Sequence, residues 1–130
     1  QEYADSQAES MLNVLACFLG DAFDSRLEFA VRSWALQDQA VADRVTVADA
    51  ARIAALTRMM ADWGHDPMSA DVRARTIYLV QIGYISMQSS EDIETRLSRI
   101  PSYVQIYTGA APEPREIARF NARLRRDGAA

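Results

Sequence analysis

Apolar positions recur at helical spacing along almost the whole chain. In the first such segment Met11, Leu12, Leu15 and Phe18 follow the i, i+3/i+4, i+7 pattern of an amphipathic helix. No alternating run of useful length predicts a strand, and the few glycines and prolines fall between the periodic segments. We therefore predict an all-α protein, a helical bundle of about five to six helices, with segments at 5–20, 24–37, 39–63, 70–88, 90–108 and 114–126.

Residues with distinct backbone preferences mark the ends of these segments. Asp38 is a natural N-cap for the third segment, and Ser69 can cap the fourth. Gly64 and Gly109 are suited to follow the last turns of the third and fifth segments. Pro101 lacks an N–H, so we expect the fifth helix to kink or break close to it. The predicted apolar stripe of the third helix consists of Val41, Val45, Ala48, Ala55, Met59 and Trp63.

The segment at 70–88 is apolar on two opposite faces. A helix of this kind must be covered on both sides, which a small domain can hardly do alone. Gly83 in mid-helix costs about 1 kcal/mol relative to alanine, and close packing against another helix would offset that cost. The Gly83 face holds Val72, Thr76, Leu79, Val80, Ser86 and Met87, and the opposite face holds Ala74, Ile77, Tyr78, Gln81 and Ile85.

The next segment, 90–108, carries an apolar stripe of its own. Two adjacent helices with apolar surface to spare predict a homodimer in which both copies contribute two helices to a four-helix bundle. The alternative is that the same residues fill the core of a monomer. The predicted dimer interface comprises Val72, Thr76, Leu79, Val80, Gly83, Met87, Leu97, Ile100, Val104 and Tyr107.

Composition and charge exclude several classes of function. A chain of 130 residues suits one domain, and its net charge of −4 gives no overall attraction to nucleic acid or an anionic membrane. The longest uncharged apolar run falls short of the roughly 18 residues of a spanning helix, so we expect no membrane contact. Cys17 and His65 are the only residues of their kinds, so we predict no metal site, no cofactor and no catalytic machinery. Cys17 lies in an apolar run, and we expect it to be buried.

Aromatic, methionine and leucine side chains from several segments could together enclose a small molecule. Apolar walls with one or two polar groups are typical of such pockets. Gln81 is the informative position, because a buried amide needs a hydrogen-bond partner that a ligand, a tyrosine or a water could supply. The alternative for each residue is simple core packing. The predicted ligand-binding set is Met11, Leu15, Phe18, Phe29, Trp34, Met59, Trp63, Tyr78, Gln81 and Ile85.

The order and spacing of four stretches resemble a known family. These are "LEFAVRSWALQDQAV" (27–41), "RIAALTRMMADWG" (52–64), "DVRARTIYLVQIGYISM" (71–87) and "EDIETRLSRIPSYVQIYTG" (91–109). Together they resemble the C-terminal regulatory domain of TetR/AcrR-family transcription regulators over about residues 10 to 109. The Pro101 interruption and the helix after Gly109 depart from that pattern.

The resemblance implies a bacterial, cytoplasmic, non-enzymatic domain spanning residues 1–130 that dimerises and binds a small, largely apolar effector. In such regulators, expected here to be a repressor, an N-terminal helix-turn-helix domain binds operator DNA. No matching segment occurs in this chain, which begins with Gln1, so we expect DNA binding only through a domain not present here. The alternative is a free-standing helical dimerisation or adaptor protein that binds no ligand.

Overall fold

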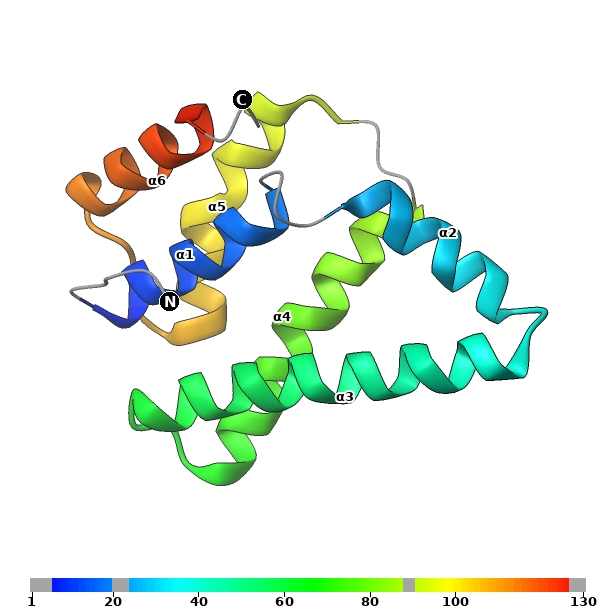
Figure 1. Cartoon of the computed structure of the whole chain (residues 1–130). Helices are drawn as coiled ribbons and strands as arrows, with labels where there is room; N and C mark the ends of the chain where they lie inside the picture. Colours follow the sequence, from blue (N-terminus) through cyan, green and yellow to red (C-terminus); the bar gives the residue numbers. More distant parts are fainter. Residues whose placement is uncertain (1–5, 20–23, 88–90, 127–130) are drawn as a thin grey trace. The chain divides into compact units, whose positions relative to one another are not determined.

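The computed structural model is all-helical, as predicted. It describes residues 6–19, 24–87 and 91–126, and this part of the chain contains six helices and no strand (Figure 1). The helices are α1 (Gln7–Leu19), α2 (Ser25–Ala35), α3 (Gln39–Asp62), α4 (Pro67–Met87), α5 (Ile93–Thr108) and α6 (Pro114–Arg126).

The chain divides into two compact units. Unit 1 comprises Gln1–Phe23 and Ser90–Ala130 and contains α1, α5 and α6, whereas unit 2 comprises Asp24–Ser89 and contains α2, α3 and α4. We call them the terminal unit and the central unit.

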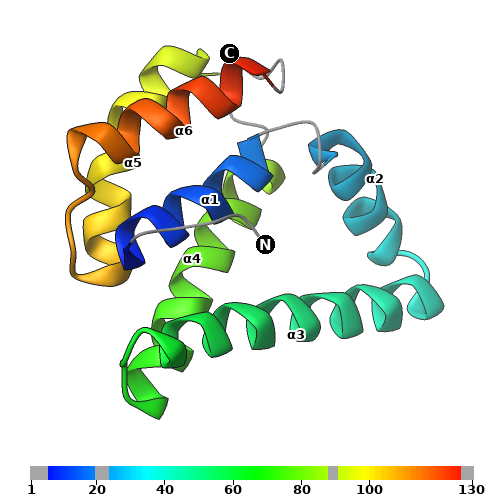
Figure 2. The same cartoon turned by 60° about the vertical axis from the view of Figure 1, so that its left-hand side comes forward.

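The central unit is built on the pairing of α3 with α4. The two helices cross and pack extensively, and α2 packs on both of them, so the three outline a triangle (Figures 1 and 2). Leu56 and Met60 of α3 and Ala70, Ala74 and Ile77 of α4 form its buried apolar centre. The small alanines of α4 allow the two backbones to approach closely.

Local capping residues fix where the central helices begin and end. Asp24 and Asp38 accept hydrogen bonds from backbone N–H groups in the first turns of α2 and α3. Gly64 follows α3 at a φ of 98°, a left-handed conformation that suits glycine, as predicted. The fourth helix begins earlier than predicted because Asp66, rather than Ser69, accepts the capping bond, and the residue that follows it is a proline at the first helical position.

The buried side of α3 differs from the predicted stripe. Ala48, Ala55 and Trp63 are exposed, whereas Leu56 and Met60 are buried and Asp49 is half-buried on the inner side. The stripe is therefore rotated by about one residue from the prediction. A pattern that follows only apolar residues misses this rotation, because Asp49 faces inward with a partner.

In the terminal unit α1 packs against both α5 and α6. Met11, Leu12 and Leu15 of α1 are fully buried, and so are Val104 of α5 and Leu124 of α6. The prediction that Cys17 is buried is wrong: α1 presents this residue on its exposed side.

Polar side chains connect the ends of α1 and α6 in this unit. Glu116 is buried and accepts a hydrogen bond from the Ser6 hydroxyl at 2.5 Å and another from the Glu113 N–H at 2.8 Å. Glu9 pairs with Arg119 at 2.6 Å. The start of α6 is therefore tied to the start of α1 by two carboxylates, each with its own donor.

Helix α5 runs without a break through Pro101 to Gly109, which caps it at a φ of 83°. The cap at Gly109 is as predicted, and of the kink or break predicted at the proline, the break does not occur. Because Pro101 has no N–H, the carbonyl of Leu97 lacks the donor that position 101 would supply in a regular helix.

Candidate functional site

The outward side of α4 carries a row of uncovered apolar and small residues. Leu79 is 63% exposed and Met87 is 83% exposed, and Val72 is also exposed. Gly83 lies on the same side, and a methyl group added there would meet no atom within 4 Å. We call Val72, Thr76, Leu79, Gly83 and Met87 the α4 outer face. The division of this helix into a buried and an outward side follows the prediction, except that Val80 and Ile85, predicted on opposite faces, are both half-buried.

An open groove runs beside this face between α3 and α4. Its volume is about 580 Å³. The α3 wall combines the small side chains of Thr46, Ala50, Ala54 and Thr57 with Asp49, Ile53 and Arg58, and Asp71 and Arg75 of α4 form the other wall. Small side chains at a groove allow another helix to approach closely, so the groove and the α4 outer face together form a surface suited to helix packing.

The α5 residues predicted for the dimer interface are less exposed than those of α4. Ile100, Val104 and Tyr107 are buried, and Leu97 is half-buried. The ring of Tyr107 also stacks on Tyr103, with the centroids 5.6 Å apart. Most of these α5 residues are therefore covered within the terminal unit, whereas Val72, Thr76, Leu79 and Met87 of α4 are exposed.

A polar network joins the three helices of the central unit around the hydroxyl of Tyr78, a residue that is only 2% exposed. This hydroxyl accepts hydrogen bonds from Arg32 Nη2 at 3.1 Å and Arg52 Nη1 at 2.9 Å, and it donates to Asp49 Oδ1 at 2.5 Å. Arg32 also binds both oxygens of Asp49 in a bidentate pair. Glu28 lies 2.9 Å from Arg32 Nε and 3.2 Å from Arg52 Nη1. We call these five residues the Tyr78 network.

The network shifts the protonation equilibria of its own members. Partial burial raises the pKa of Asp49, but hydrogen bonds from Arg32 and Tyr78 and the nearby positive charges outweigh burial, so the pKa lies below its usual value. Burial, together with the hydrogen bond to Asp49, raises the pKa of Tyr78 even though Arg52 opposes the change. At neutral pH the network therefore contains a charged carboxylate and a neutral phenol.

The ten predicted ligand-binding residues are divided between the two units. Met11 and Leu15 are buried and Phe18 is half-buried in the terminal unit. In the central unit Tyr78 and Gln81 are buried side by side on the inner face of α4. Trp34 and Trp63 are exposed, and Phe29, Met59 and Ile85 are half-buried. The structure therefore brings Tyr78 and Gln81 together on one face.

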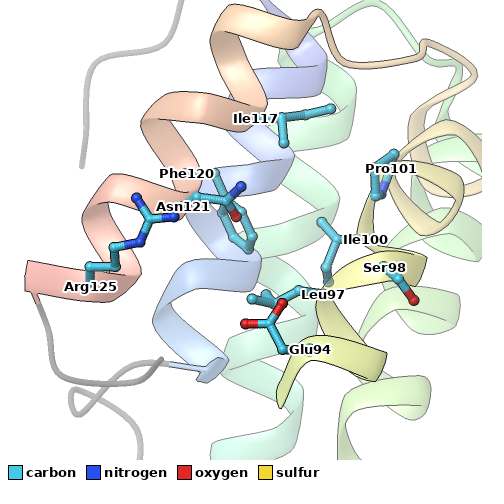
Figure 3. Close-up of a pocket in the computed structure, with 9 residues that line it drawn as sticks. All are labelled: Glu94, Leu97, Ser98, Ile100, Pro101, Ile117, Phe120, Asn121 and Arg125. Carbon is cyan, nitrogen blue, oxygen red and sulfur yellow. The ribbon is translucent and has the colours of Figure 1, made fainter. Parts of the chain in front are cut away.

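A cavity of about 260 Å³ lies between α5 and α6 in the terminal unit. Figure 3 shows its lining side chains converging from the two helices. Apolar and polar residues both contribute to the wall. The lining consists of Glu94, Leu97, Ser98, Ile100, Pro101, Ile117, Phe120, Asn121 and Arg125.

Sequence reasoning missed the charged members of the Tyr78 network. Glu28 and Arg32 are four residues apart on one helix, a spacing that signals an ion pair. Asp49 and Arg52, three apart, likewise share one side of α3. Both spacings can be recognised in the sequence. The convergence of these side chains on Tyr78 cannot, because it depends on contacts between residues up to 46 positions apart.

No family model, curated protein or solved structure matches this chain. Within the described ranges there is no cluster of three metal-ligating side chains. None of the described helices is long and apolar enough to cross a membrane.

Proposed function

We propose that this chain is the dimerising, effector-sensing domain of a TetR-type transcription regulator. The observation that carries the proposal is the α4 outer face, an apolar surface on a helix whose opposite side is buried. A second copy of the chain is the occupant we assign to it, because Gly83 and the small residues of the neighbouring groove suit close packing about a two-fold axis.

The effector would act on the inner face of the same helix. Tyr78, Gln81 and Ile85 lie there, and a ligand that separates α2 from α4 would act against the Tyr78 network, which joins those helices. Binding would then shift the equilibrium between two arrangements of the α4 helices, and through them the spacing of two DNA-binding domains outside this chain. The role is regulatory rather than enzymatic, and its setting is the cytoplasm.

Sedimentation velocity on Leu79→Asp tests the dimer. Burying one leucine contributes about 1.5–3 kcal/mol, and a two-fold interface contains each residue twice, so the loss is about 3–6 kcal/mol. The dimer dissociation constant should rise by about two to four orders of magnitude.

Leu36→Asp is the matched control, because Leu36 is 87% exposed in the turn after α2 and lies off the α4 outer face. The unchanged chain and the control should both be dimers at micromolar concentration. A monomeric unchanged chain, or equal effects of the two variants, would refute the assigned interface.

The same α4 outer face would also serve a helical dimerisation or adaptor protein without a ligand. Trp34 and Trp63 are the only tryptophans, and both lie in the central unit, so their fluorescence reports on this unit. A saturable change in fluorescence with an apolar compound supports the sensor. A dimer that shows no such change with any compound of a diverse set supports the adaptor.

A further inference from the structure

The α5–α6 cavity has the form of a binding site for a small molecule. Both helices pack on α1 but make few contacts with each other, so a groove remains between them. Ile100 and Phe120 are buried and form its base, with Leu97, Pro101 and Ile117 beside them (Figure 3). The cavity therefore has an apolar base, also contains polar lining residues, and opens to the surface.

Its polar groups come from both helices. Figure 3 shows Glu94 on α5 and Arg125 on α6 away from the end formed by Ile117 and Pro101. Glu94 belongs to the first turn of α5 and Arg125 to the last turn of α6. The cavity lining thus includes a carboxylate on one helix and a guanidinium on the other.

These two charges have no ion-pair partner within the described part of the chain. Other arginines of the terminal unit do have one: Arg99 pairs with Glu91 at 2.5 Å, and Arg119 pairs with Glu9. Charged groups in the lining of the cavity are available to a ligand that carries the complementary charges.

Two uncharged groups add hydrogen-bonding capacity. The Asn121 side chain lines the cavity and can both donate and accept. The Leu97 carbonyl lacks its regular helical donor because of Pro101, and both residues line the cavity.

We propose that this cavity binds a free α-amino acid with an apolar side chain. The ligand carboxylate pairs with Arg125, its ammonium pairs with Glu94, and its side chain packs on Ile100 and Phe120. A simple fatty acid would leave Glu94 facing another carboxylate, and a simple amine would leave Arg125 facing another cation. A zwitterion satisfies both charges.

The size of the cavity agrees with this class of ligand. Liquid water occupies about 30 Å³ per molecule, so a volume of about 260 Å³ corresponds to about nine water molecules, and leucine has a similar number of non-hydrogen atoms. The proposal concerns the terminal unit and does not depend on dimerisation through α4.

Titration calorimetry of the whole chain with L-leucine tests the proposal. Two analogues of leucine serve as comparison ligands: 4-methylpentanoate lacks the ammonium, and 3-methylbutylamine lacks the carboxylate. Leucine should bind with saturable heat at millimolar concentration or below, and each analogue should bind at least about tenfold more weakly, since one lost charged contact is worth about 1.4 kcal/mol or more. No binding of leucine overturns the proposal, and equal binding of either analogue refutes the zwitterion.

Variants then place the binding in this cavity. Glu94→Gln and Arg125→Gln change exposed side chains and should each weaken leucine binding about tenfold or more without changing helicity. Arg126→Gln is the matched control, because Arg126 is the next residue of the same helix and does not line the cavity. If the control weakens binding as much as Arg125→Gln does, the effect is one of net charge and the assigned site is wrong.

Discussion

Replacing Tyr78 by phenylalanine removes a single hydroxyl from the centre of the central unit. The ring remains and fills the same space, so packing against α2 and α3 is kept. Three hydrogen bonds are lost, and each of them joins the hydroxyl to a charged group, at Arg32, Arg52 or Asp49. The substitution therefore isolates the polar contribution of the Tyr78 network to stability.

The remaining contacts set the size of the effect. A hydrogen bond to a charged group contributes about 1.5–3 kcal/mol, and three independent bonds would exceed that value. The side chains of Arg32 and Arg52 are 20% and 39% exposed, so water can replace the lost acceptor at both. Asp49 also retains its bidentate pair with Arg32. We therefore expect a total loss of about 1.5–3 kcal/mol, close to the value of one such bond.

Urea unfolding measures this loss. With a slope of about 1–3 kcal/mol per molar urea, the midpoint should fall by about 1 M. Tryptophan fluorescence follows the central unit through Trp34 and Trp63, and circular dichroism follows all six helices. Asp71→Asn is the control, because it breaks the exposed α4 pair with Arg75, which should contribute about 0.3–0.5 kcal/mol.

A double-mutant cycle with Asp49→Asn tests the reasoning directly. If the hydroxyl acts through the network, the two substitutions together should cost less than the sum of their separate effects, by about 0.5–3 kcal/mol. Additive effects, or a change below about 0.5 kcal/mol for Tyr78→Phe alone, would show that the network does not hold the three helices together.

Three further predictions follow from pKa shifts and from glycine geometry. The pKa of Asp49 is lowered on folding, so its stabilising effect is present at neutral pH and is lost as pH falls below about 4. The urea midpoints of the unchanged chain and of Asp49→Asn should therefore converge in acid. Because the pKa of Tyr78 is raised, the advantage of the unchanged chain over Tyr78→Phe should shrink as pH rises above about 10, and a constant difference would contradict the assignment. Gly109→Ala should destabilise the chain by about 1–2 kcal/mol, because the φ of Gly109 is 83°. Gly83 lies within a helix, and a methyl group added there meets no atom within 4 Å. Gly83→Ala should therefore stabilise the monomer by up to about 1 kcal/mol and weaken only the proposed dimer. Urea midpoints and sedimentation separate these outcomes, and a dimer unaffected by Gly83→Ala would argue against close packing there.

The sequence alone determined the helices and most of their ends. Apolar spacing located all six segments, and Asp38, Gly64 and Gly109 marked boundaries at the residues where the structure has them. These features are local, because a cap or a helical period depends on residues within a few positions of one another. For the same reason the two faces of α4 could be assigned before any neighbour was known.

Only the tertiary structure decided which sides of the other helices are buried. In α3 the inward side includes Asp49, whose burial is tolerable only because Arg32 and Tyr78 reach it from other helices. In α5 the apolar stripe is the same whether it fills a core or meets a partner, and the structure places Val104 inside. The cavity beside it exists because α5 and α6 both pack on α1 and leave space between them, and no periodicity within one helix records that space.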